Sequence, residues 1–523
     1  MAPASGYGGR AHIKESAPPM ADETRITACW TRLKALPVPD LRGLFASDPG
    51  RLAAHVIEEG TLRFDFSKTH LTGESLDAFL ALAQAVDFVG GRAAMFAGEA
   101  INVTEGRAVE HTAERGEGKA ASVEAAREHK IRMRTLIDAI EAGALGEIRH
   151  ILHVGIGGSA LGPDLLVDAL ARHADRYDVA IVSNVDGVAM EDAMARFDPH
   201  VTLLVVASKT FTTTETMLNA ASAIEWMQAA GVDDPYGHVI ALTAAPEKAI
   251  EWGVDETRIL GFPESVGGRY SLWSSIGFPA ALALGWDGFE ALLEGAATMD
   301  RHFRHAAPLE NAPLRAAFVD QFYARVMACQ TRAVFAYDER LRLLPSYLQQ
   351  LEMESNGKSV KADGTPVDGP TAAITWGGVG TDAQHAVFQL LHQGTHIVPV
   401  EFIAVTEGGD NLDPAHHQTL LVNCFAQGAA LMQGRENPAD PARAYPGNRP
   451  STTILLDELT PHALGALIAF YEHRTFANGL LMQINSFDQF GVELGKEIAR
   501  TIERDGAQGF DPSTMALIDR ALG

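Results

Sequence analysis

The sequence contains only three cysteines in 523 residues, and they form no CxxC pair. Cys29, Cys329 and Cys424 are far apart along the chain. Such scattered cysteines are not typical of the disulfide framework of a small secreted domain. They are typical of thiols that stay reduced. We therefore expect a cytoplasmic protein without disulfides.

Positive charge is also scarce, and long apolar runs are absent. Lys and Arg number 42 against 67 Asp and Glu, which gives a formal net charge of −25. This balance argues against a nucleic-acid partner and against an anionic membrane surface. No apolar run approaches the length of a membrane span. Residues 1–20 lack the apolar stretch of a secretory signal. We expect them to form a flexible N-terminus, and Met20 is a second candidate start.

What the chain does contain is an alternation of strand and helix patterns, which predicts an α/β fold. Residues 30–140 look mostly helical, and beyond them short apolar runs alternate with amphipathic stretches. This alternation is typical of parallel sheets covered on both faces, and 523 residues are too many for one core, so two lobes are expected. The expected strands are 148–154, 179–183, 202–207, 238–242 and 258–261, then 333–337, 396–405 and 452–456.

A hydroxyl-rich turn follows the third of these strands. The segment Ser208-Lys-Thr-Phe-Thr-Thr-Thr-Glu-Thr216 lies between the apolar run 202–207 and a helical pattern. A helix N-terminus presents free N–H groups and a partial positive charge, which suit a phosphate. The alternative is a hydroxyl-rich helix cap without a ligand.

A glycine-rich turn follows the first expected strand. The segment Gly155-Ile-Gly-Gly-Ser159-Ala-Leu-Gly-Pro163 would let backbone approach a ligand closely, with Ser159 offering a hydroxyl. Its spacing differs from the GxGxxG of dinucleotide sites, and no acidic residue stands cleanly at the end of the next strand. A sugar-phosphate pocket is therefore favoured over an NAD-dependent dehydrogenase or a purely structural turn.

Four further segments carry candidate catalytic side chains. Arg269 follows two glycines and could steady anionic charge, although an ordinary salt bridge is the alternative. Glu352 and Glu354 are two positions apart and should point to different faces of a helix, whereas Gln350 and Glu354 share a face. The segment Gly377-Gly-Val-Gly-Thr-Asp-Ala-Gln-His385 is expected to be a loop that leads to His385 at the start of a helix.

Neither His385 nor Lys496 identifies a site by itself. His385 is followed by His392 and His396, but no carboxylate completes a metal-ligand set, so hydrogen-bonded histidines are favoured over a metal. Lys496, taken alone, would be a solvated helix residue.

Together these segments resemble the phosphoglucose isomerase (glucose-6-phosphate isomerase) family. The family patterns, in chain order, are GIGGSxLGP at 155–163, SKTFTTxET at 208–216, VGGRYSLWS at 266–274, QQxxMESNGK at 349–358, QHAxxQLxHQGT at 384–395 and NSFDQxGVELGK at 485–496. The segments 102–109 and 447–450 also resemble the family, and all these matches follow the family's order from about residue 100 to 500.

The resemblance implies interconversion of glucose 6-phosphate and fructose 6-phosphate in glycolysis and gluconeogenesis, without metal or organic cofactor. Glu354 would move a proton between C2 and C1, Arg269 would stabilise the enediolate, and Gln350 would position the sugar. Ring opening would be assisted by Lys496 and by His385, contributed by the other subunit of a homodimer. The phosphate would be held by Gly158, Ser159, Ser208, Lys209, Thr210, Thr213 and Thr216.

The resemblance also implies two SIS-type doubly wound lobes with helical extensions at both ends. The expected division is a flexible terminus (1–20), a helical segment packing on the large lobe (21–120), a phosphate-binding lobe (121–285), a second lobe (286–510) and a tail (511–523). The chain departs from the family at Asp382 and Ala383, just before His385, and at Glu110 and Glu114, where the family tends to be apolar. A carboxylate at 382 would favour a protonated His385.

Two rival functions stay open at this stage. An isomerase of another sugar phosphate, such as mannose 6-phosphate, would use the same reacting atoms and phosphate site. A non-catalytic sugar-phosphate sensor built from SIS lobes would not need Glu354, Arg269, His385 and Lys496 together, so their joint presence argues against it.

Overall fold

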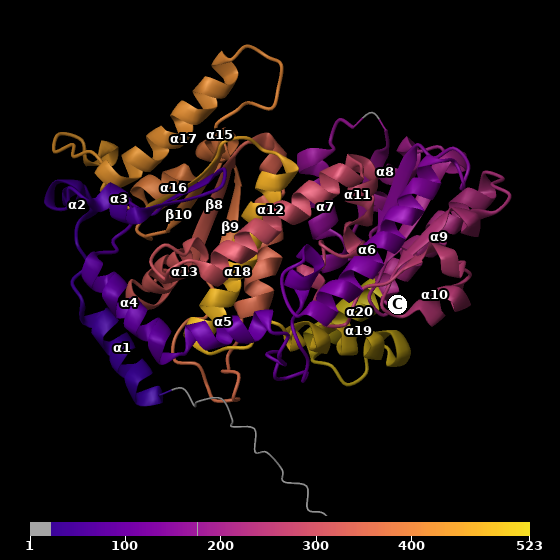
Figure 1. Ribbon diagram of the computed structural model, residues 1–523, viewed down its shortest axis with the longest axis horizontal. Coiled ribbons are helices and arrows are strands. Elements are labelled where there is room, and N and C mark those ends of the chain that lie inside the picture. The colour runs from indigo at the N-terminus through magenta and orange to yellow at the C-terminus, as the bar shows by residue number, and fades with distance from the viewer. Residues whose placement is uncertain (1–21, 175, 523) are drawn as a thin grey trace, which may run out of the picture.

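The computed structural model describes residues 22–174 and 176–522 as two α/β lobes that lie side by side (Figure 1). The expectation for residues 1–20 lies outside the described residues. The first lobe contains a five-stranded, fully parallel sheet in the order β4-β3-β5-β6-β7. Its strands are β3 (His150–Val154), β4 (Asp178–Val182), β5 (Thr202–Ala207), β6 (Val239–Leu242) and β7 (Ile259–Leu260). The order reverses between β3 and β5, which is the doubly wound arrangement.

The second lobe contains a six-stranded sheet in the order β1-β2-β11-β10-β8-β9. Four of its strands, β8 (Thr331–Tyr337), β9 (Ile374–Val379), β10 (Val400–Val405) and β11 (Ser451–Leu456), are parallel and reverse order between β8 and β10. The antiparallel hairpin of β1 (Val56–Glu59) and β2 (Leu62–Asp65) adds to β11. The α/β prediction with parallel-sheet cores is thus confirmed, with an antiparallel extension that the sequence did not indicate.

Helices cover the sheets and form the middle of the molecule, where α12 (Trp286–His305) and α18 (Pro461–Met482) lie in Figure 1. One hydrophobic cluster contains residues of both sheets, such as Val205 and Ile403, together with the buried faces of α12 and α18. The two helices approach so closely that a Cβ at Gly295 would lie 1.9 Å from the carbonyl oxygen of His462. Glycine is therefore required at this crossing of two helices, both of which contribute to the hydrophobic cluster that the two sheets share.

The described part of the chain contains the following helices, given in chain order. Their bounds are α1 Glu23–Ala35, α2 Leu41–Ser47, α3 Arg51–His55, α4 Gly73–Ala85, α5 Phe88–Phe96, α6 Ala120–Glu141, α7 Leu161–Leu170, α8 Gly187–Arg196, α9 Thr214–Ala229, α10 Pro246–Trp252, α11 Phe278–Leu284, α12 Trp286–His305, α13 Ala312–Gln321, α14 Leu344–Gln349, α15 Gly380–Ala386, α16 Phe388–Gln393, α17 Ala415–Gln433, α18 Pro461–Met482, α19 Glu493–Asp505 and α20 Pro512–Leu522. In the described part of the chain no single helix is long and apolar enough to cross a membrane, and α4 and α5 meet that test only as a pair bent by 57°.

The segment before His385 differs from our expectation. We expected a loop from Gly377 that leads to His385 at the start of a helix. Instead, 374–379 form β9 and α15 begins at Gly380, so that His385 lies near the end of that helix. The strand is hard to recognise in the sequence because it contains Gly377. A Cβ at this position would lie 1.8 Å from the carbonyl oxygen of Val334 on β8. Close pairing of two strands, rather than loop flexibility, therefore requires this glycine.

Candidate active site

Two of the predicted ligand-binding turns meet at the edge of the first sheet. The glycine turn Gly155–Ser159 follows β3 and the hydroxyl turn Ser208–Thr213 follows β5, and these adjacent strands flank the point where strand order reverses. In doubly wound sheets this crevice, at the carboxyl ends of the strands, is where ligands bind.

The hydroxyl turn is built from contacts among its own side chains. Ser208 Oγ lies 3.0 Å from Thr213 Oγ1, and Thr213, the N-cap of α9, makes no capping hydrogen bond with its side chain. The first-turn N–H groups of this helix therefore keep donors for a ligand, which counts against a hydroxyl-rich cap as the explanation of the turn. Thr210 is exposed and contacts Thr212, while the buried Thr216 Oγ1 has no hydrogen-bond partner among the described residues.

Lys209 connects this turn to the segment that precedes Arg269. Its Nζ donates to the carbonyl oxygens of Glu264, at 2.9 Å, and Val266, at 3.3 Å. Burial, and secondly the nearby Arg107, lower the pKa of the Lys209 ammonium. The cation is thus held at the hydroxyl turn at an electrostatic cost that a bound anion would offset.

The glycine turn packs directly on the backbone before Arg269. A Cβ at Gly158 would lie 2.2 Å from the carbonyl carbon of Gly268, and a Cβ at Gly157 would lie 3.0 Å from Gln350 Nε2. Ser159 is half-buried, and its carbonyl oxygen lies 2.7 Å from His153 Nε2. The turn therefore contacts both the backbone before Arg269 and the side chain of Gln350.

Arg269 is buried and fixed by four hydrogen bonds. Nε donates to Ser355 Oγ at 2.6 Å, and Nη1 donates to Gln489 Oε1 at 2.9 Å. Nη2 donates to the carbonyl oxygens of Ser486, at 2.6 Å, and Asp488, at 3.1 Å. A guanidinium has five N–H donors, so one N–H on Nη1 stays unused among the described residues. That nitrogen is the one nearest Glu354.

Glu354 lies at the end of a π-helical turn, η10 (Gln350–Glu354), and its Oε1 is 3.7 Å from Arg269 Nη1. The two carboxylates of this turn diverge as expected, because Glu352 is buried against Arg332 and Thr375. Gln350 and Glu354 both line a cavity of about 650 Å³. An ionisable group beside a fixed cation at the wall of a cavity is an arrangement suited to moving a proton.

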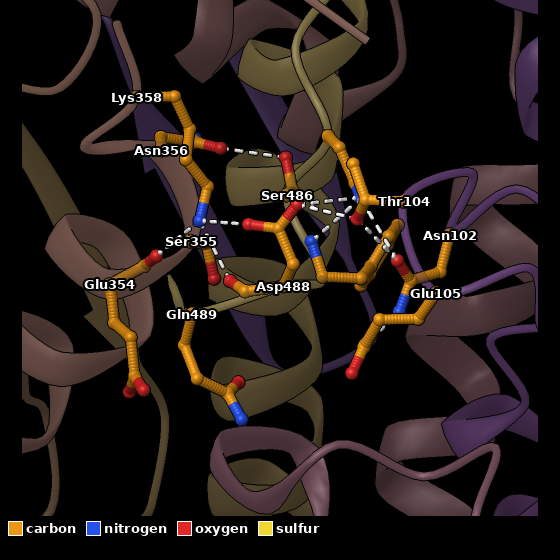
Figure 2. Close-up of polar contacts among 12 residues, drawn as sticks. Asn102, Thr104, Glu105, Glu354, Ser355, Asn356, Lys358, Ser486, Asp488 and Gln489 are labelled. Carbon is orange, nitrogen blue, oxygen red and sulfur yellow. Dashed lines mark hydrogen bonds and ion pairs between the residues drawn. The ribbon is translucent and has the colours of Figure 1, made fainter. Parts of the chain in front are cut away.

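Around this cavity lies a polar network whose members we did not single out from the sequence. Asp488 accepts hydrogen bonds from Thr104, at 2.7 Å, and Asn485, at 2.9 Å, and forms an ion pair with Lys358 at 2.8 Å (Figure 2). Gln489, which binds Arg269, lines the cavity too. Lys358 stands within the motif at 349–358, and Asn485, Asp488 and Gln489 stand within the motif at 485–496, whereas Thr104 lies outside both. Nothing in their spacing shows that they meet.

His385 and Lys496 are not brought to this cavity. His385 is exposed and lines a separate hollow of about 710 Å³ with Gln384, His392 and Tyr445. His392 binds Gln427 at 2.8 Å, in agreement with a hydrogen-bonded rather than a metal-bound histidine. Lys496 is exposed on α19, a helix without buried residues.

The fold and the site together define a two-lobed α/β protein with doubly wound parallel-sheet cores. Residues 65–518 match the family described as phosphoglucose isomerase, and the chain belongs to this family. It is 71% identical over 500 residues to the glucose-6-phosphate isomerase of Rhizorhabdus wittichii, covering 96% of this chain and all of that protein. It is 65% identical over 504 residues to the enzyme of the same name from Zymomonas mobilis, covering 96% and 99% of the two chains.

A solved structure agrees with this relationship. The crystal structure of a glucose-6-phosphate isomerase from Chlamydia trachomatis superposes with a TM-score of 0.86 at 30% identity. The match covers 95% of this chain and 98% of the other. The similarity thus extends over both lobes and not over one of them.

Proposed function

We propose that this chain interconverts glucose 6-phosphate and fructose 6-phosphate and that Glu354 is the base in this reaction. The relatives of the chain are named glucose-6-phosphate isomerases. The observation that carries this assignment is the Glu354 carboxylate at the cavity wall, 3.7 Å from a guanidinium that is itself immobilised. Aldose–ketose isomerisation requires a base that removes a proton from the carbon next to a carbonyl. One carboxylate can carry that proton between C2 and C1 on one face of a planar cis-enediol.

Arg269 would stabilise the negative charge of the enediolate. Its free N–H on Nη1 can donate to a substrate oxygen, while its other donors are used to hold it in place. A fixed cation stabilises developing anionic charge more than it stabilises the neutral sugar, and this difference lowers the barrier. Gln350, on the same turn as Glu354, would hold a sugar hydroxyl.

The two turns at the end of the first sheet would hold the phosphate. The free N-terminus of α9, the hydroxyls of Ser208 and Thr213, and the Lys209 ammonium supply donors and positive charge there. A phosphate fixed at this place would restrain the distant reacting carbons and so supply part of the rate enhancement.

The direct test is isomerisation of fructose 6-phosphate by the purified protein. Formation of glucose 6-phosphate would be followed through a coupled dehydrogenase, and mannose 6-phosphate would be assayed separately. Rapid formation of glucose 6-phosphate alone supports the assignment. Formation of mannose 6-phosphate would favour the rival isomerase, and binding of fructose 6-phosphate without turnover would favour a sensor.

We further propose a homodimer in which His385 of the partner subunit and Lys496 assist ring opening. Two observations support this. His385 is exposed, away from the cavity that Glu354 lines, and so is free to enter another subunit's site. The helix that carries Lys496 also exposes the apolar side chains of Leu494, at 64%, and Ile498, at 39%, which an interface would cover.

Mixing two inactive variants tests whether His385 acts across the interface. Glu354→Gln and His385→Ala would be unfolded and refolded together, so that heterodimers form. Each heterodimer would contain one site with both native groups, and random pairing would restore about a quarter of the native activity. Recovery would be absent if His385 served its own subunit, and size measurement by light scattering would detect a monomer.

We place the protein in the cytoplasm. Cys29, Cys329 and Cys424 are all buried and unpaired. Free thiols are usual where the surroundings are reducing. The distribution of a fluorescently tagged chain in its native cell would test this.

A further inference from the structure

Lys358 lines the same cavity as Glu354, but its ammonium group has no donor left for a ligand (Figure 2). Nζ donates to the carbonyl oxygen of Glu354 at 3.0 Å and to the carbonyl oxygen of Asp488 at 2.7 Å. It also lies 2.8 Å from Asp488 Oδ1. An ammonium has three N–H donors, so these three acceptors saturate it.

The acceptors belong to the two segments that carry the reacting groups. One is the backbone of Glu354 itself. Another, the carbonyl oxygen of Asp488, also accepts a hydrogen bond from Arg269 Nη2 at 3.1 Å. A single ammonium therefore fixes the backbone of the base relative to the segment that immobilises the guanidinium.

Asp488 is itself held from the opposite side. Its Oδ2 accepts from Thr104 Oγ1 at 2.7 Å and from Asn485 Nδ2 at 2.9 Å. The side chains of Lys358 and Asp488 are 15% and 8% exposed, so their ion pair is largely shielded from water. A largely buried pair has a strict geometry because neither charge can be left alone without a large penalty.

We propose that Lys358 is a positioning residue that holds the Glu354 carboxylate in register with Arg269 and that does not itself bind the sugar phosphate. The proposal rests on the roles assigned above to Glu354 and Arg269. We call the three acceptors around Lys358 Nζ the junction. A compact ammonium with three donors suits this junction, whereas the planar guanidinium of an arginine does not match its geometry.

The test is a comparison of Lys358→Met with Lys361→Met. Lys361 lines the same cavity, but its Nζ pairs with Glu23 at 2.9 Å, so its removal deletes the same charge without touching the junction. For Lys358→Met we expect kcat to fall about 100-fold, since a misplacement of about 1 Å costs that much, and KM for fructose 6-phosphate to stay within about threefold. Lys361→Met should resemble the native protein in both constants.

Either of two results would overturn the proposal. A rise in KM of about tenfold or more with kcat preserved would make Lys358 a substrate ligand, and unchanged constants would make it irrelevant to the reaction. Thermal unfolding verifies that the variant is folded at the assay temperature. Should Lys358→Met not fold, Asp488→Asn keeps the shape of the junction and removes its charge, and the same loss confined to kcat is expected.

Glu354→Gln, assayed in parallel, separates this proposal from the one on which it rests. Full activity of Glu354→Gln would reject the assignment of the base. Loss of activity in Glu354→Gln together with native kinetics in Lys358→Met would reject only the positioning role.

Discussion

Glu352 and Glu354 stand two positions apart on one π-helical turn, and their carboxylates lie in different surroundings. The Glu352 carboxylate is buried and binds Arg332 at 2.5 Å and Thr375 at 3.0 Å. The Glu354 side chain is 21% exposed at the cavity and faces Arg269. π-Helical turns are rare in proteins, and those that occur are often found at functional sites. Here the buried Glu352 carboxylate fixes the turn through Arg332 and Thr375, while the Glu354 carboxylate stays accessible at the cavity.

Replacement of Glu354 by Gln removes the base but keeps the size of the side chain. We expect kcat to fall by about 10³-fold or more, because general-base catalysis typically contributes a factor of about 10² to 10⁴. Binding of fructose 6-phosphate, measured by calorimetry, should survive. A variant that keeps most of its activity would show that another residue moves the proton.

Glu352→Gln should act on stability instead. The change leaves Arg332 with a weakened buried partner, and breaking such a pair costs about 3 kcal/mol. The melting temperature should fall measurably relative to the native chain. An unchanged melting temperature with lost kcat would mean that Glu352 takes part in the chemistry.

Lys209→Met should weaken substrate binding. Loss of a charged donor at the hydroxyl turn is expected to raise KM for fructose 6-phosphate about tenfold or more, in line with the strength of charged hydrogen bonds. Lys248→Met is the matched control, because Lys248 is exposed and only donates to the Thr210 carbonyl oxygen at 3.3 Å. Equal effects of the two changes would reject a specific role for Lys209.

Glu114 makes stability depend on pH. Its carboxylate is 1% exposed and has no hydrogen-bond partner among the described residues, and burial raises its pKa from 4.5 to about 7, opposed by Lys130. Between these values the folded state retains a proton that the unfolded chain has lost, so stability falls as pH rises from about 4.5 to 7.

Glu114→Gln removes this titration. We expect the variant to exceed the native chain in stability at pH 8 by up to about 3 kcal/mol, and to differ little at pH 4.5. Thermal unfolding at the two pH values measures the difference. A constant difference across this range would show that Glu114 does not titrate there.

Chelation should leave the rate unchanged. The proposed mechanism assigns the stabilising positive charge to Arg269, so no step requires a divalent cation. Activity would be measured with and without EDTA, with the coupling dehydrogenase tested alone under both conditions. A loss that a divalent cation restores would contradict the mechanism.

The strands of the first sheet could be predicted from the sequence because each is a short apolar run, as in β5, which is buried throughout. The hairpin of β1 and β2 could not. Its strands have four residues each, and β2 is stabilised by pairing with 453–456, far along the chain. Strand β9 contains two glycines, and its identity depends on its pairing with β8. Local patterns do not report such distant partners.

The sequence by itself determined the α/β class, the family, and which residue types could bind a phosphate or move a proton. The tertiary structure alone decided which of them meet. It brings Glu354, Lys358 and Asp488 to one cavity, places Arg269 3.7 Å from Glu354, and leaves His385 and Lys496 outside that cavity. The physical reason is that local preferences act over a few residues, whereas these contacts join separate segments through the packing of two lobes around one core.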